Sequence, residues 1–148
     1  MIDTGTPTHA QLVADSIGEA PSASLHVSLP ADADAPEYAC EMTAALLGHV
    51  RGAETVKKNA LLIVSELARN VVMHAYELGE PGPLVMDLAL SATTLTILVS
   101  DEGRGTGVSS PEAGSGVGWK LVAELSQDFT IIQRGEGGTL VQARLNLR

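Results

Sequence analysis

Apolar and polar residues follow two different periods along this chain, and the pattern predicts five strands and three helices. Leu25, Val27 and Leu29 alternate with polar residues, which is typical of a half-buried strand, and Pro30 ends the run. Longer segments carry apolar residues at helical spacing, and Gly-rich turns separate the later strands. The expected elements are a strand over 25–29, helices over 36–50 and 54–76, strands over 84–90 and 95–101, a helix over 117–127, and strands over 129–134 and 139–147.

Local signals predict where several elements begin and end. Asp34 followed by Glu37 is typical of a helix capping box, Gly52 is a stop signal, and residues 135–138 predict a hairpin turn. The middle of the second helix is apolar nearly all round, so we expect that helix to be central and buried. The order of the elements predicts an α+β fold, a two-layer sandwich with helices on one face of a mixed, mostly antiparallel sheet.

Composition predicts one domain, residues 23–148, behind a flexible N-terminal arm. Residues 1–22 are rich in Thr, Ser, Gly, Ala and Pro, which is typical of a mobile or loosely attached segment. The hydrophobic content of 45% is enough for one core, and because aromatic residues make up only 3% that core must consist of Leu, Val, Ile and Ala.

Charge and targeting signals narrow the function classes. The formal net charge is −9 and the basic residues are scattered, which argues against a nucleic-acid partner and against binding to an acidic membrane surface. The sequence shows no secretory signal and no apolar run of membrane-spanning length. Cys40 is the single cysteine, so no internal disulfide forms. We therefore expect a cytoplasmic protein of bacterial type.

Two polar residues stand in rows of core-facing positions. Asp101 ends the apolar row of its strand, and a carboxylate there needs a hydrogen-bond donor. Thr139 shares its face with the apolar residues of the last strand, whose other face we expect to be solvated: Gln142, Arg144 and Asn146. Asp101 and Thr139 could converge on one ligand. Alternatively, Asp101 caps a turn and Thr139 closes a hairpin.

A polar stripe and two glycine clusters complete the candidate chemistry. Glu66, Asn70 and His74 recur every four residues on one face of the long helix, where a cation site and plain solvent exposure are both consistent with them. The second glycine cluster, residues 114–118, opens directly into a helix and suits a polyphosphate. It has neither the Gly-Lys-Ser/Thr ending of a Walker loop nor the early position of a Rossmann loop.

Taken in order, these segments resemble the Bergerat-fold ATPases, also called the GHKL superfamily, and in particular the anti-sigma factor serine kinases of bacterial partner-switching systems. Residues 66–76, ELARNVVMHAY, are similar to the N box of that family. Further similar motifs are Asp101-x-Gly103-x-Gly105, Gly114-x-Gly116-x-Gly118 and the pair Gly138-Thr139. The likeness extends over about 23–147.

The resemblance implies a role for each matching position. Asn70 would chelate a Mg²⁺ ion that bridges the phosphates, and Glu66 would act as general base towards a water or a substrate serine. Asp101 would accept a hydrogen bond from the adenine amino group, with Thr139 supporting the adenine side. Close approach of the base and wrapping of the phosphates would fall to the glycines, namely Gly103, Gly105, Gly114, Gly116 and Gly118. Lys120 and Arg104 are the nearest cations to those phosphates, although Arg104 also fits a solvated loop charge.

The resemblance also implies partners. ATP and Mg²⁺ would fill the pocket, the chain would phosphorylate an anti-sigma factor antagonist protein in a stress response, and a sigma factor would compete for binding. A homodimer stays open. A sensor histidine kinase is not expected, because no phosphoacceptor domain precedes the ATPase region and His74 lies inside the N box.

Three alternatives stay open. Residues 65–70 are also similar to stress-pathway kinases that activate a phosphatase without binding sigma. The chain could equally be an ATP-binding interaction module without kinase activity. A scaffold that binds no nucleotide would require all the motifs to be coincidental.

Overall fold

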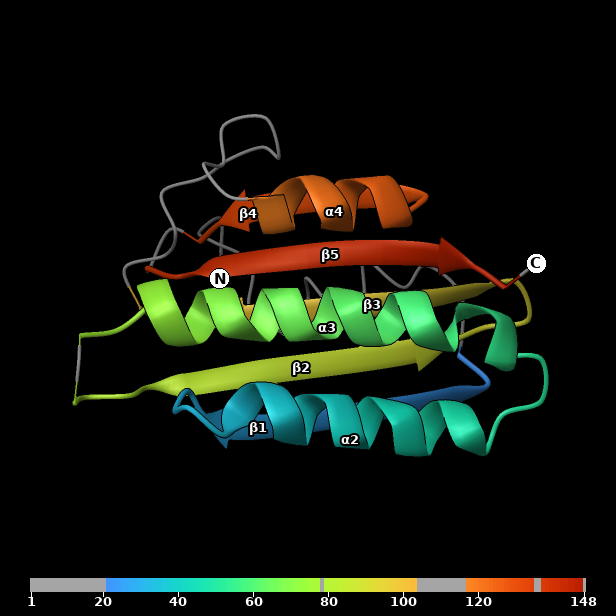
Figure 1. The fold of residues 1–148 in the computed structure, drawn as a ribbon, viewed down its shortest axis with the longest axis horizontal. Coiled ribbons are helices and arrows are strands. Elements are labelled where there is room, and N and C mark those ends of the chain that lie inside the picture. The colour runs from blue at the N-terminus through green and yellow to red at the C-terminus, as the bar shows by residue number, and fades with distance from the viewer. Residues whose placement is uncertain (1–20, 78, 104–116, 135–136, 148) are drawn as a thin grey trace, which may run out of the picture.

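The computed structural model describes residues 21–77, 79–103, 117–134 and 137–147. The expected order of elements is confirmed (Figure 1). The elements are β1 (Ala23–Pro30), α2 (Ala35–Gly48), α3 (Glu54–His74), β2 (Pro83–Leu90), β3 (Thr94–Asp101), α4 (Val117–Leu125), β4 (Asp128–Gln133) and β5 (Thr139–Asn146).

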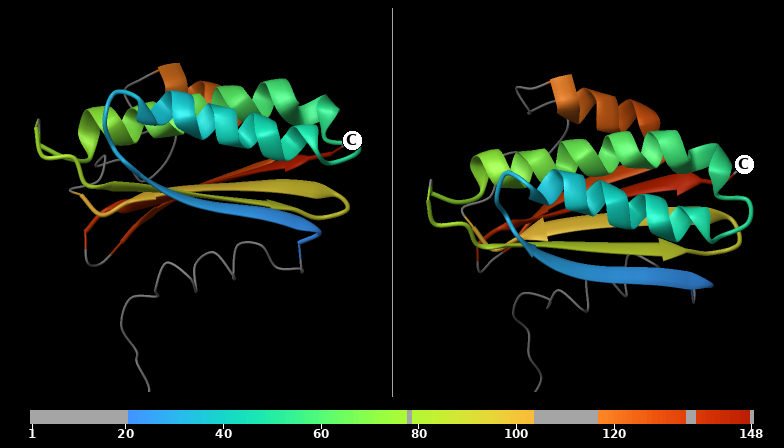
Figure 2. Two further views of the ribbon diagram at one scale, coloured as in Figure 1. Left: turned by 90° about the horizontal axis from the view of Figure 1, so that it is seen from below. Right: turned by 60° about the horizontal axis from the view of Figure 1, so that its bottom comes forward.

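The five strands form one sheet in the order β1-β2-β3-β5-β4, and every neighbouring pair is antiparallel. The three helices lie together on one face of this sheet (Figure 2). The predicted two-layer α+β sandwich is therefore confirmed. Its register sets Asp101, the last residue of β3, opposite Leu84, the second residue of β2.

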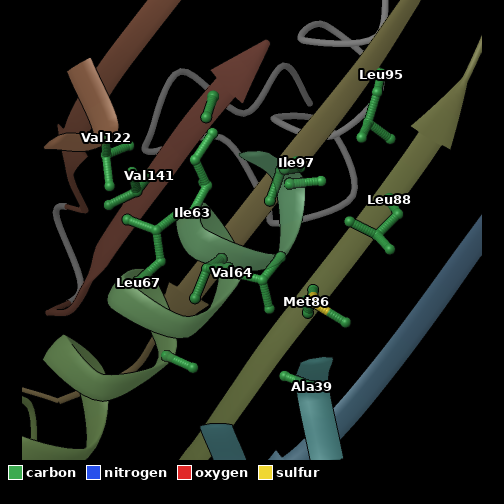
Figure 3. Close-up of a cluster of buried hydrophobic side chains, with 14 of the residues drawn as sticks. Ala39, Ile63, Val64, Leu67, Met86, Leu88, Leu95, Ile97, Val122 and Val141 are labelled. Atoms are coloured by element: carbon green, nitrogen blue, oxygen red, sulfur yellow. The ribbon is translucent and has the colours of Figure 1, made fainter. Parts of the chain in front are cut away.

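Helix α3 is the central helix, with α2 on one side and α4 on the other (Figure 1). Its buried face includes Ile63, Val64 and Leu67, and packs on the alternate apolar residues of the sheet, such as Met86, Leu88 and Ile97 (Figure 3). Leu62 is an exception to the expected burial because its side chain points away from the sheet and stays 40% exposed. No helix in the described ranges is long and apolar enough to cross a membrane.

Aliphatic side chains make up almost all of the core, as the composition predicts. Trp119 is the large exception: it is buried on α4 and its ring lies 5.9 Å from that of Phe129 on β4. This contact fastens α4 to the edge of the sheet. It also fixes the first turn of α4, the element that follows the second glycine cluster.

Two local expectations are wrong. Asp34 occupies the N-cap position of α2, but its side chain makes no capping hydrogen bond. Instead, its backbone N–H donates to Asp32 Oδ1 at 3.0 Å, and Pro36 stands in the first turn, where no N–H is needed. Gln142, which we expected to be solvated, is only 8% exposed, whereas Asn146 on the same face is exposed. Polar character alone does not keep a position on a central strand exposed.

Gly138 and Gly52 give a matched pair for testing the backbone of the β4–β5 turn. Both have a positive φ, +98° and +89°, which disfavours any side chain. A Cβ on Gly138 would also overlap the carbonyl oxygen of Asp101, whereas a Cβ on Gly52 would meet nothing within 4 Å. We expect Gly52→Ala to cost about 1 kcal/mol of unfolding free energy and Gly138→Ala roughly 1–3 kcal/mol more, because the backbone must move. Urea unfolding measures both, and equal losses would contradict the predicted overlap.

Candidate functional site

Asp101 is the buried carboxylate that the sequence singles out. It is 2% exposed, and its Oδ1 accepts a hydrogen bond from the Gly103 N–H at 3.0 Å. Burial raises the pKa of this carboxyl above its ordinary value, and backbone N–H groups of Gly103 and Thr139 together with the charge of Arg134 offset only part of that rise. The expectation that Asp101 caps a turn is therefore correct, and yet the capped carboxylate stays in an environment unfavourable to its charge.

Thr139 and Gly138 bring the last hairpin against Asp101. Thr139 is 1% exposed, its backbone N–H bonds to the Asp101 carboxylate, and its hydroxyl donates to Gln133 Oε1 at 3.3 Å. Gly138 packs so closely on the Asp101 carbonyl that no Cβ fits between them. Asp101 and Thr139 are thus in contact in the structure, and their convergence on one ligand stays a prediction.

Tyr76 connects the C-terminal end of α3 to the start of β2 and to the turn after β3. Its hydroxyl donates to the Pro83 carbonyl at 2.5 Å and accepts from the Glu102 N–H at 2.8 Å. Beside it, the Ala75 carbonyl presses on Gly103, where a Cβ would overlap the oxygen. The two residues that directly follow α3 therefore fix the turn after Asp101. Sequence reasoning assigned Tyr76 no role, although it is one of only two tyrosines and ends the N-box segment.

Arg134 is the second residue that sequence reasoning missed. Its Nη1 donates to the Asp101 carbonyl at 3.0 Å, and its charge lowers the pKa of the Asp101 carboxyl. Its Nε is buried and has no hydrogen-bond partner among the described residues. The available signal was its position, directly before the Gly-rich turn that approaches Asp101.

Glu66 lies at a second cluster, where α3 meets α4. Its side chain is 20% exposed, and Arg69 Nη2 lies 3.4 Å from its Oε1. The other carboxylate oxygen faces Gly118, where a Cβ would overlap it. The structure thus brings the carboxylate of the polar stripe against the end of the second glycine cluster.

Asn70, one helical turn from Glu66, carries an unpaired donor. Its Nδ2 is buried and has no hydrogen-bond partner among the described residues. Leaving such a group unsatisfied costs about 1–3 kcal/mol, which favours a partner that the described residues do not supply. His74 continues the stripe but is exposed, as a surface residue would be.

The two clusters lie at different points along the length of α3, one beside Glu66 and the other at its C-terminal end. The helix from Glu66 to Ala75 spans about 13 Å at 1.5 Å per residue, so a ligand that touches both clusters must be elongated. Lys120 is exposed on α4. The remaining predicted positions, Gly105, Gly114, Gly116 and Arg104, lie outside the described residues. The described ranges hold no group of three or more His, Cys, Asp or Glu side chains that could bind a metal.

A groove of about 660 Å³ borders the site on the other side of Tyr76. It lies between the β1–α2 connection and the end of α3, and its walls include Ala31, Val72, Met73 and Pro81. Glu66, Asn70 and Asp101 do not line it. Tyr76 is therefore shared between this groove and the turn that follows Asp101.

The raised pKa of Asp101 predicts how pH affects stability. Because the folded state favours the protonated carboxyl, this residue should cost stability as pH rises from its unfolded-state pKa through its higher folded-state pKa. Asp101→Asn keeps the size of the side chain but carries no charge. The variant should be more stable than the parent at neutral pH, and the difference should disappear in acid. Urea unfolding across this range measures the difference.

The exposed Glu41 in the middle of α2 supplies the control, since Glu41→Gln should leave the stability nearly unchanged at every pH. If Asp101→Asn also ran parallel to the parent from acid to neutral pH, the burial penalty on the Asp101 charge would be refuted.

Comparisons with known proteins agree with this fold. The sequence model of the Histidine kinase-like ATPase domain matches residues 29–145. Among solved structures, the chain is similar to the RsbU and RsbW domains of Rv1364c from Mycobacterium tuberculosis, with a TM-score of 0.66 and 21% sequence identity. That match covers 86% of this chain, which spans 33% of the longer chain. No curated protein matches the sequence.

The family match includes both clusters of the site, from Glu66 and Asn70 to Asp101 and Thr139. The structural likeness, at 21% identity, supports the fold. Since the family model matches most of the chain, the chain belongs to the histidine kinase-like ATPase domain family, which implies that it binds ATP.

Proposed function

We propose that this chain is an ATP-dependent protein serine kinase that phosphorylates a small antagonist protein and binds a sigma factor as its anti-sigma factor. The observation that carries the proposal is the pairing, one helical turn apart on α3, of the unpartnered Asn70 amide with Glu66. A protein that only binds ATP needs a side chain such as Asn70 near the phosphates. It does not need the Glu66 carboxylate, which lies against Gly118 at the start of α4.

The described residues fit a nucleotide at both ends. At the base end, the ionised Asp101 carboxylate would accept from the adenine amino group, and such a bond offsets the cost of its burial. At the phosphate end, rotating the Asn70 amide exchanges its oxygen and nitrogen, so the same buried position offers an oxygen to Mg²⁺ or a donor to a phosphate. Thr139 and Arg134 would hold Asp101 in place.

Glu66 is the proposed general base. Mg-ATP supplies the phosphoryl group when it is bound. Glu66 would accept the proton from the substrate serine, and the ion pair with Arg69, 3.4 Å away, holds its side chain in place. The Gly118 backbone lets the carboxylate approach the start of α4, where helix N–H groups favour phosphate. The glycines proposed to wrap the phosphates, Gly114 and Gly116, lie outside the described residues.

Partner switching follows from charge. The antagonist and the sigma factor would compete for the chain in a cytoplasmic stress response. Phosphorylation adds nearly two negative charges to the antagonist, and a chain of formal net charge −9 would then repel it. The likeness to a chain whose name includes an RsbW domain supports this choice of partners. A kinase of the activator branch would show the same phosphorylation without binding sigma, so a pull-down of sigma factor separates the two.

Glu66→Gln tests whether Glu66 is the base. The variant keeps the size of the side chain but cannot take up the proton, so ATP binding should persist while serine phosphorylation falls by roughly 10²–10⁴-fold. The measurement is incubation with ATP, Mg²⁺ and a panel of candidate antagonist proteins, followed by phosphopeptide mapping, with ATP binding followed by calorimetry.

Two further variants serve as a control for this test and as a test of Mg²⁺-dependent binding. Glu41→Gln, at an exposed position of α2, should change neither binding nor phosphorylation. Asn70→Ala should weaken ATP binding mainly when Mg²⁺ is present. Undiminished phosphorylation by Glu66→Gln would remove Glu66 as the base, and a parent that binds ATP but phosphorylates no antagonist would favour the interaction module.

A further inference from the structure

The sheet face turned away from the helices, here called the far face, is buried along its middle strand. Side chains alternate along β3, and Thr96, Leu98 and Ser100 point away from the helices, unlike Ile97 and Val99 of the core. Their exposed fractions are only 2%, 0% and 1%. An antiparallel sheet with one free face normally presents it to water, so this burial requires a cover.

The buried part of the far face is limited to the central strands of the sheet. On the strands beside β3, four far-face residues are also buried: Asp87 and Ala89 of β2, and Leu140 and Gln142 of β5. Towards the strand ends the burial decreases, because Val85 and Arg144 are half-buried and Asn146 is exposed. On the outer strands, the far-face residues Ser24 and His26 of β1 and Thr130 of β4 are exposed, and Ile132 of β4 is half-buried. The cover therefore lies over β2, β3 and β5 and leaves the two edges open.

None of the described elements lies over this face. Helices α2, α3 and α4 all pack on the opposite face (Figure 2). The longest parts of the chain outside the described ranges are residues 1–20 and 104–116. Residues 104–116 connect the end of β3 to α4, which belongs to the helix layer. Residues 1–20 are therefore the better candidate.

The point where residues 1–20 join the sheet supports this choice. The backbone N–H of Ser22 donates to the Leu90 carbonyl at 2.6 Å, and its hydroxyl donates to the same oxygen at 3.0 Å. The chain therefore reaches the end of β2, one of the three covered strands, before β1 begins. A strand of eight residues is about 27 Å long, and even a fully helical segment of twenty residues would reach about 30 Å.

The sequence of this segment has an apolar stripe. Ala10, Val13, Ala14 and Ile17 recur at the i, i+3, i+4, i+7 spacing of an amphipathic helix, and Gly18 follows as a stop signal. Leu12 lies off the stripe. We propose that residues 9–17 form a helix that packs its apolar stripe on the far face over Leu98 and Leu140. The N-terminal arm is then a third layer of the domain.

The proposal goes beyond ATP binding and is independent of kinase activity. Removing the arm would expose three apolar side chains at the centre of the sheet, Ala89, Leu98 and Leu140, among the buried polar residues of the far face.

A cysteine probe measures the cover directly. Thr96→Cys, in a Cys40→Ala background, places a thiol at the centre of the far face, and Ser24→Cys places one on its exposed edge. In the parent, a thiol reagent should label position 96 at least tenfold more slowly than position 24. The double substitution Val13→Asp with Ile17→Asp disrupts the stripe and should raise labelling at position 96 at least tenfold.

The matched control is Gln11→Asp with Ser16→Asp, which adds the same charge to the same segment but off the stripe and should leave labelling unchanged. Equal labelling rates in the two double variants would overturn the proposal, as would fast labelling of position 96 in the parent. So would protection that weakens on dilution as a dimer dissociates, because a second copy would then be the cover. Deleting residues 1–20 should also raise labelling, and if that chain does not fold, the double variants still decide.

Discussion

The burial of the Asp101 carboxylate is the constraint on which the rest of the site depends. A carboxylate 2% exposed is costly to ionise, and the protein compensates with backbone donors from two directions, Gly103 and Thr139. Both donors require close backbone approach. Gly138 and Gly103 therefore stand where a Cβ would overlap a carbonyl oxygen of a neighbouring segment.

Helix α3 connects this buried carboxylate to the second half of the site. Ala75 and Tyr76, which directly follow the helix, hold the turn after Asp101, and the second half of the helix carries Glu66 and Asn70. One rigid helix therefore fixes the spacing between an acceptor suited to a base and a pair of side chains suited to phosphates and a metal ion. The buried Asn70 Nδ2 without a hydrogen-bond partner lowers the stability of the fold at the point where the ligand is proposed to bind.

Periodicity was enough to predict the order and type of all the elements, with ends within two residues, because strands and helices bury one face each. It also placed Asp101 and Thr139 together, since both end or begin core-facing rows.

The predictions that failed did so for physical reasons. The predicted capping box of Asp34 and Glu37 does not form, and the backbone N–H of Asp34 donates to the Asp32 carboxylate, which the local pattern did not indicate. Tyr76 and Arg134 act through backbone carbonyls of segments distant in sequence, and no local pattern encodes such partners. Gln142 is buried despite its polar character.

The most direct test is whether Asp101 makes the protein prefer adenine over guanine nucleotides. Calorimetry should compare the affinities of ATP and GTP for the parent and for Asp101→Asn, with Mg²⁺ constant. A hydrogen bond to a charged group contributes about 1.5–3 kcal/mol, so the parent should prefer ATP, and the variant should lose roughly tenfold or more of that preference. A parent without preference for ATP, or a variant that keeps the preference intact, would contradict the assignment of Asp101 to the adenine end of the pocket.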